Sequence, residues 1–159
     1  MKKGNMRQLI DEIWRTHVNA GSPSNFKDVR SFHTKFGIGR QSPYPHLFEK
    51  DVWDFRLIFL RQELTEIEDA YAANDLVGFF DGLIDLVFVA LGTADLAALP
   101  WQSGWNIVQW ANMQKQRVAN AEESRIVTGR GHHLDVIKPP GWISPDLLLK
   151  ELLDGLYHA

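Results

Sequence analysis

The feature that most constrains the fold is the segment at residues 75–96, which is apolar on nearly every side when it is drawn as a helix. A helix of that kind belongs in a protein interior. Asp81 and Asp85 nevertheless stand within it, four residues apart and therefore on one helical face. Carboxylates held in an interior without partners would cost roughly several kcal/mol each. The sequence therefore predicts that something positively charged meets these two aspartates.

A second pair of acidic residues lies on the preceding segment, residues 51–73. Apolar side chains recur there every three or four residues from Trp53 to Tyr71, which predicts an amphipathic helix. Glu63 and Glu66 are three residues apart and border this apolar stripe. Because only the short turn AAND joins the two segments, we expect the helices to lie antiparallel with their acid pairs facing.

The rest of the chain is also mostly helical in pattern. Further helices are expected at about 6–18, 26–36, 103–120 and 145–156. The aperiodic segment at about 121–143 predicts a loop, which could be a flap, a hairpin or a functional loop. We therefore expect a single all-α domain over residues 1–159. Its fold would be a helical bundle with core helices at about 51–73, 75–96 and 103–120.

Composition narrows the classes of function. A net charge of −3 with no basic stripe argues against a nucleic-acid polymer as partner. The absence of cysteine excludes disulfides and thiolate metal sites. Asp81, Asp85 and Asp95 interrupt the most apolar region, so no membrane span is expected. The first residues carry no apolar signal core, and we expect a cytoplasmic protein.

Two facing acid pairs would form a site rich in carboxylate oxygens, the ligands that Mg²⁺ and Mn²⁺ prefer. Such a site keeps open positions for substrate phosphates, which suits metal-assisted attack of water on a phosphoanhydride. The residues alone leave two alternatives open. The glutamates could be a solvated helix face, and Asp81 and Asp85 could instead pair with Arg56, Arg61 or a lysine of a neighbouring helix.

In their order along the chain, these motifs resemble those of the all-α nucleoside triphosphate pyrophosphohydrolases, which include the MazG-like and phosphoribosyl-ATP pyrophosphohydrolase-like proteins. ELTE at residues 63–66 is similar to the family's E-x-x-E, and DGLIDLVFVALGTA looks like the D-x-x-x-D version of its second motif in small, phage-type members. DVRSFHTKFG, WANMQK and DVIKPPGWISPDL extend the resemblance over most of the chain. Two positions depart from the pattern. Gln62 stands where many members carry another acid, and Asp81 lies four rather than three residues before Asp85.

The resemblance implies a nucleotide pyrophosphohydrolase that converts a nucleoside triphosphate, or a similar nucleotide, to the monophosphate and pyrophosphate. It implies Mg²⁺, with Mn²⁺ as a substitute, on Glu63, Glu66, Asp81 and Asp85. Glu63 and Glu66 would be the catalytic pair, one of which accepts the proton of the attacking water. It also implies a homodimer or homotetramer. Two alternatives remain: a non-catalytic helical module that binds a nucleotide or a protein, which Gln62 favours, and a phosphoribosyl-ATP pyrophosphohydrolase.

Four further residues are candidates for substrate binding. Asn112 and Lys115 lie three residues apart on one helical face, with Arg117 close by, and similar Asn and Lys positions in the family serve the nucleotide. Lys138, which precedes PPGW, could reach a phosphate. The alternatives are a cationic last helical turn that complements the helix dipole, and an ordinary surface lysine.

The histidines give weaker signals. His33 in FHTKFG is expected at a helix cap or at the edge of the core. His132 and His133 with Asp135 suggest a metal cluster, but adjacent histidines on a loop are poor grounds for one.

Overall fold

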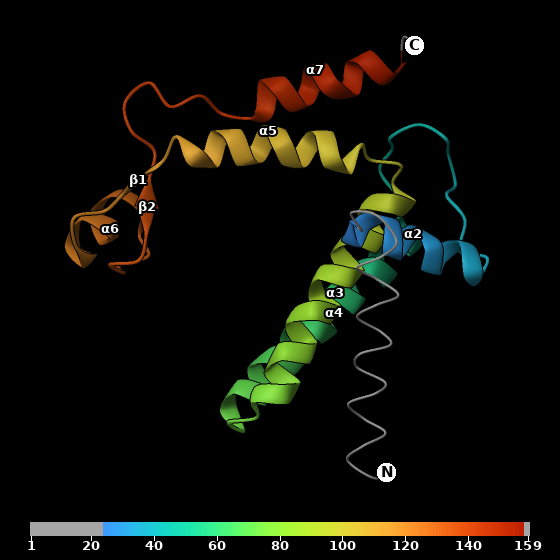
Figure 1. Ribbon diagram of the computed structural model, residues 1–159, viewed down its shortest axis with the longest axis horizontal. Coiled ribbons are helices and arrows are strands. Elements are labelled where there is room, and N and C mark those ends of the chain that lie inside the picture. The colour runs from blue at the N-terminus through green and yellow to red at the C-terminus, as the bar shows by residue number, and fades with distance from the viewer. Residues whose placement is uncertain (1–23, 158–159) are drawn as a thin grey trace. The chain divides into compact units, whose positions relative to one another are not determined.

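The computed structural model describes residues 24–157 (Figure 1). The chain divides into two compact units, which are residues 1–99 and residues 100–159. The described residues form six α-helices and one two-stranded sheet. The prediction of an all-α fold is therefore confirmed. The helix expected at about 6–18 lies outside the described residues, and the single domain stays a prediction.

The first unit contains α2 (Asn25–Lys35), α3 (Lys50–Ala72) and α4 (Leu76–Leu96). The last two confirm the long helices predicted at 51–73 and 75–96. Asn74 makes the turn between them with a φ of +54°, in the left-handed region that asparagine tolerates better than most residues. Asp75 caps α4, because its carboxylate accepts hydrogen bonds from the backbone N–H groups of Val77 and Gly78.

Helices α3 and α4 run antiparallel and side by side (Figure 1). Glycines of α4 allow their close approach. A methyl group at position 82 would come within 2.9 Å of Ile67 Cγ1, and one at position 78 within 3.3 Å of Ala70 Cβ. These two pairs fix the helical register, since residue 82 meets 67 and residue 78 meets 70. By the same register, residue 85 lies level with residue 63.

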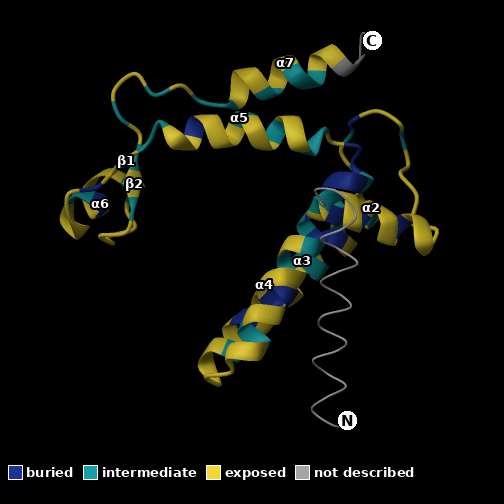
Figure 2. Ribbon diagram, in the orientation of Figure 1, coloured by how far each residue is buried: buried dark blue, intermediate teal, exposed yellow. Residues whose placement is uncertain are grey.

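The buried residues of α4 lie mainly in its C-terminal half (Figure 2), where α2 also packs against it. By length and composition alone, α4 is long and apolar enough to cross a membrane. The core helix of a bundle passes the same test. The expectations of no membrane span and of a cytoplasmic setting stay predictions.

The second unit contains three helices and a short β-ribbon. Its elements are α5 (Trp101–Met113), β1 (Gln116–Arg117), α6 (Ala121–Thr128), β2 (Val136–Ile137) and α7 (Asp146–Tyr157). Helix α7 confirms the predicted helix at 145–156. The helix predicted at 103–120 instead ends at Met113, because the following residues extend and pair with β2. Within this unit α5 packs along α7.

The loop predicted at 121–143 is wrong in part, because it contains α6 and β2. Asn120 caps α6 by accepting a hydrogen bond from the Glu123 N–H at 2.9 Å, and Gly129 ends the helix with a φ of +79°. Ser124 of this helix is fully buried. A helix of only eight residues shows too few turns for its periodicity to stand out in the sequence.

Candidate active site

The four predicted metal-binding carboxylates occupy the facing surfaces of α3 and α4. Glu63 is 7% exposed, whereas Glu66, Asp81 and Asp85 are exposed. The helical register brings Glu63 level with Asp85, and Glu66 close to the level of Asp81. Burial raises the pKa of Glu63, and the negative charges of Glu66, Asp85 and Asp81 raise it further. The two acid pairs therefore face each other closely enough to interact electrostatically.

The expectation that Asp81 and Asp85 lie in the protein interior is wrong for this chain. Both are exposed, and so are the neighbouring apolar side chains Phe80, Leu83 and Ile84. This part of α4 is therefore apolar on nearly every side, yet the first unit does not bury it. Any requirement for a positive partner rests instead on the mutual repulsion of the four carboxylates and on the buried Glu63.

The basic residues considered as partners of the aspartates do not pair with them. Arg56 is buried and turns to the backbone of α4, where its Nη2 donates to the Val89 carbonyl at 2.7 Å. Its Nε donates to Thr93 Oγ1 at 3.1 Å. Within residues 24–157, none of the four carboxylates makes an ion pair with a basic side chain. Within the described part of the protein, their charge is therefore not neutralised by ion pairs.

The donor set suits a hard divalent cation. Carboxylate oxygens are the preferred ligands of Mg²⁺, and a cation among four unpaired carboxylates would relieve the repulsion that raises the pKa of Glu63. In the described part of the chain, no three Asp, Glu or His side chains are gathered closely enough to hold one ion. The assignment of these residues as metal ligands therefore stays a prediction.

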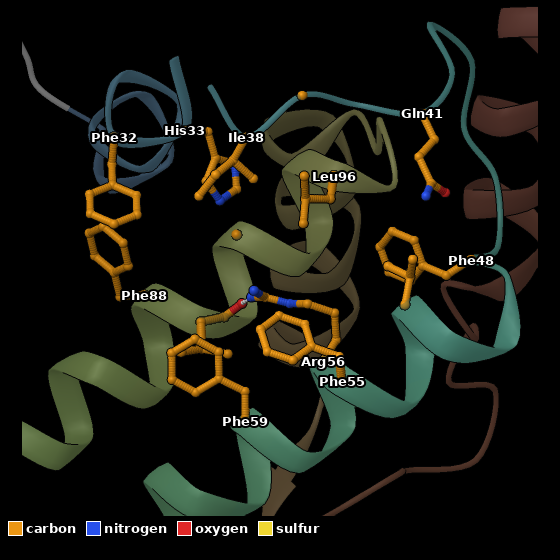
Figure 3. A pocket seen from close by; sticks show the side chains of 14 residues that line it. Phe32, His33, Ile38, Gln41, Phe48, Phe55, Arg56, Phe59, Phe88 and Leu96 are labelled. Atoms are coloured by element: carbon orange, nitrogen blue, oxygen red, sulfur yellow. Dashed lines mark hydrogen bonds between the residues drawn. The ribbon is translucent and has the colours of Figure 1, made fainter. Parts of the chain in front are cut away.

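A mostly apolar cavity of about 490 Å³ lies between α2, α3 and α4 (Figure 3), and the nearest of its lining residues are one helical turn from the carboxylates. Phe59 lies one turn before Glu63, and Val89 lies one turn after Asp85. Polar groups reach the cavity from Arg56, His33 and Gln41. Its aromatic lining consists of Phe32, Phe48, Phe55, Phe59 and Phe88.

Sequence reasoning missed a polar network at the end of α4. Asp95 is 4% exposed, and its Oδ2 accepts a hydrogen bond from Nδ1 of the buried His33 at 2.9 Å. Its Oδ1 accepts from Arg40 Nε at 3.2 Å and from Arg40 Nη2 at 2.5 Å. Burial alone would raise the pKa of Asp95, but the hydrogen bonds from Arg40 and His33 outweigh it and lower that pKa. The available signal was an aspartate within an apolar helix, which needs a positive partner.

The four residues predicted to bind substrate all lie in the second unit. Gln116 pairs with Ile137 and Arg117 with Val136. Lys115 directly precedes β1 and Lys138 directly follows β2. Asn112 lies in the last turn of α5. The ribbon thus gathers three cations from two separate segments.

Neighbouring residues fix this ribbon. The Lys138 ammonium lies 4.5 Å from the centre of the Trp142 ring, and Trp142 Nε1 donates to the Ala111 carbonyl of α5 at 2.7 Å. The Val118 N–H donates to the Asp135 carbonyl at 3.2 Å. These bonds tie the segment around Lys138 to the residues that precede α6.

Asp135 is held by hydrogen bonds and not by a metal cluster with the adjacent histidines. Its Oδ2 accepts from Thr128 Oγ1 at 2.6 Å, Ser124 Oγ at 2.7 Å and Arg130 Nε at 3.1 Å. The hydrogen bond from Thr128 has the largest effect on the pKa of Asp135, which these bonds together hold far below its usual value. Such a carboxylate anchors the loop between α6 and β2.

Residues 29–112, more than half of the chain, match the sequence model of one protein family, phosphoribosyl-ATP pyrophosphohydrolase. The chain belongs to this family. It is therefore a member of the MazG-like all-α superfamily that its motifs resemble, and an enzyme whose family hydrolyses phosphoanhydride bonds of nucleotides. Pyrophosphohydrolases of this family generally depend on a divalent metal ion. A comparison with curated proteins gave no match.

The span that matches the phosphoribosyl-ATP pyrophosphohydrolase family contains all four carboxylates and Asn112, and it ends before Lys115. Family membership speaks against the non-catalytic module that Gln62 had favoured. The nucleotide that is hydrolysed and the roles of the individual residues stay predictions.

Proposed function

We propose that the protein hydrolyses a nucleoside triphosphate, or a similar nucleotide, to the monophosphate and pyrophosphate with Mg²⁺, for which Mn²⁺ can substitute. One observation carries this proposal: two acid pairs face each other across α3 and α4, and no basic side chain of the described residues pairs with them. A polyphosphate would be repelled by such a surface unless a cation lay between them. Glu63, Glu66, Asp81 and Asp85 are the residues that would hold it.

Bound at these carboxylates, Mg²⁺ would offset the charge of the polyphosphate and lower the pKa of a water molecule. The chain itself supplies orientation and a proton acceptor. Glu63 and Glu66 are the candidates to accept the proton of the attacking water. Gly82 supports their placement, because its lack of a side chain lets α3 and α4 approach closely. Glu63 is thereby held level with Asp85, and Glu66 close to the level of Asp81.

The aromatic cavity one helical turn from the carboxylates supports a nucleotide as the substrate, since a base can stack on phenylalanine rings. We further propose that Asn112, Lys115, Arg117 and Lys138 bind substrate, with the three cations of the ribbon contacting phosphate oxygens.

Product analysis tests the proposal. The protein with Mg²⁺ is incubated with a panel of standard and modified triphosphates, and pyrophosphate and orthophosphate are measured separately. We expect pyrophosphate, and we expect Asp85→Asn and Glu66→Gln to abolish its release. Glu68→Gln, an exposed change on the same helix, serves as the matched control. Release of orthophosphate alone, or undiminished turnover in the two site variants, would contradict the proposal.

Phosphoribosyl-ATP is the second candidate substrate, and the family match favours it. The same assay with phosphoribosyl-ATP decides between the two. A kcat/KM for this compound above that of every triphosphate would replace the first proposal with the second, while the assignment of the carboxylates would stand.

We also propose that the protein assembles as a homodimer or homotetramer through the exposed apolar face of α4. Phe80, Ile84 and Val87 are 64%, 49% and 50% exposed, and together they line a groove with α2. Apolar side chains clustered in this way mark interaction surfaces. Sedimentation velocity over a range of concentrations measures the assembly. A monomer at every concentration would contradict it.

A further inference from the structure

A second charged region of the first unit lies at the far end of α4 from the four carboxylates. Helix α2 ends near Gly37, which turns the chain with a φ of +67°, and the Ile38 N–H donates to the His33 carbonyl at 2.9 Å. This turn brings Arg40 back to α4, where it meets Asp95. Arg30 of α2 reaches the same carboxylate, with its Nε 3.4 Å from Asp95 Oδ1.

Positive charge exceeds negative charge in this region. Two guanidinium groups converge on a single carboxylate, which leaves a surplus of about one positive charge. Each guanidinium carries five N–H donors. Asp95 receives two hydrogen bonds from Arg40, and Arg30 approaches it only through its Nε. Asp95 therefore engages few of the available donors.

The remaining donors are accessible. The side chain of Arg30 is 55% exposed and that of Arg40 is 29% exposed, whereas that of Asp95 is only 6% exposed. Both arginines line an open cavity of about 310 Å³, together with Thr34 and the glycines of the 37–39 turn. Asp95 thus lies at the base of the cavity and fixes the arginines, whose outer N–H groups line its wall. A fixed pair of guanidinium groups matches the geometry of a phosphate.

We propose that Arg30 and Arg40 form a binding site for a phosphate group, apart from the four carboxylates of the active site. Asp95 lies ten residues beyond Asp85 on α4, which corresponds to about 15 Å along a helix. The same chemistry is presented by inorganic phosphate, by the pyrophosphate product and by a phosphate ester of a nucleotide. The role of Asp95 is to hold the two arginines in place.

Calorimetric titration of metal-free protein with inorganic phosphate, at constant ionic strength and with a chelator present, tests this site. Without a metal ion the active-site carboxylates repel phosphate, and the Arg30 variant separates binding at the two arginines from binding at the cations of the ribbon. We expect Arg30→Gln to weaken phosphate binding about tenfold or more, because it removes charge-assisted hydrogen bonds. Arg30 is the better position to change, because its contact with Asp95 is the longer one. The double variant Asp81→Asn with Asp85→Asn should keep its phosphate affinity.

Lys35→Gln is the matched control, because it removes one positive charge from an exposed position of α2 that does not line this cavity. Wild-type protein that binds no phosphate, or Arg30→Gln protein that binds it as tightly as the control does, would overturn the proposal. In that case the arginines serve only to neutralise Asp95.

Competition by pyrophosphate and by a nucleoside monophosphate then identifies the source of the phosphate. Tighter binding of pyrophosphate indicates a product site, and tighter binding of the monophosphate indicates a nucleotide site. Both results support a phosphate site at the arginines. Since no turnover is measured, failure of this proposal and failure of the proposed hydrolysis are separate outcomes.

Discussion

Replacing Glu63 with glutamine should stabilise the metal-free protein while it abolishes hydrolysis. The magnitude follows from the positions of the charges. Neighbouring side chains on one helix face lie about 6 Å apart, and two unit charges at that separation repel by about 0.7 kcal/mol in a water-like dielectric. A water-like dielectric applies because Glu66, Asp81 and Asp85 are exposed. Glu66, on the same helix, contributes one such repulsion, and Asp85 and Asp81 on α4 add smaller ones, so we expect a gain of about 1–2 kcal/mol.

Thermal unfolding in the presence of a chelator measures this gain. For a chain of this length, about 1–2 kcal/mol corresponds to a rise in Tm of about 2–8 °C. The folded-state pKa of Glu63 is raised above its unfolded value by burial and by the neighbouring carboxylates. The stability that protonated Glu63 contributes is therefore fully present below its unfolded pKa and is lost as the pH rises through its folded pKa. The difference in Tm between Glu63→Gln and the wild type should therefore be present at pH 7 and vanish near pH 4.

Added Mg²⁺ should reverse the order of stability. A cation that binds only the folded protein raises its Tm, and the wild type should gain more than Glu63→Gln because it keeps all four carboxylates. Glu68→Gln, on the exposed surface of the same helix, should leave both Tm values unchanged. A lower Tm for Glu63→Gln in the chelator would refute the reasoning, because it would mean that the folded protein stabilises the ionised Glu63.

Two further changes test the packing of each unit. Gly82→Ala places a methyl group within 2.9 Å of Ile67 Cγ1, so an overpacking cost of about 1–3 kcal/mol should outweigh a helix-propensity gain of about 1 kcal/mol and should also lower kcat. Gly155→Ala meets nothing within 4 Å and should be stabilising. Urea unfolding measures the stability of both variants. In the second unit, the lowered pKa of Asp135 means that its stabilising contribution is present above its unfolded pKa of about 3.9 and is lost as the pH falls through its folded pKa. Acid unfolding followed by tryptophan fluorescence should therefore begin at higher pH in Asp135→Asn than in the wild type, and coincident curves would contradict this.

The parts of the fold that could be predicted from sequence are those with long, regular signals. Helices α3 and α4 span 23 and 21 residues, so their periodicity and their short connection were sufficient to place the acid pairs face to face. The ribbon could not be found in this way. Its strands are two residues long and pair across an intervening helix, and no local pattern encodes such a pairing. The burial of Asp81 and Asp85 was predicted wrongly because apolarity was taken as burial within the chain itself.

The glycines of α4 explain how uncompensated acid and several arginines coexist in one small unit. Gly82 lets α3 approach where the acid pairs face each other, and Gly92 makes room at the other end, where a methyl group would come within 3.2 Å of both Arg56 Nη2 and His33 Nε2. There Arg56 donates to the backbone of α4, and Arg40 donates to Asp95. These basic groups are fixed by partners of their own and are not free to swing toward the carboxylates. The negative charge at the middle of α3 and α4 therefore forms no ion pair with these groups, which is the condition on which the proposed binding of a cation there depends.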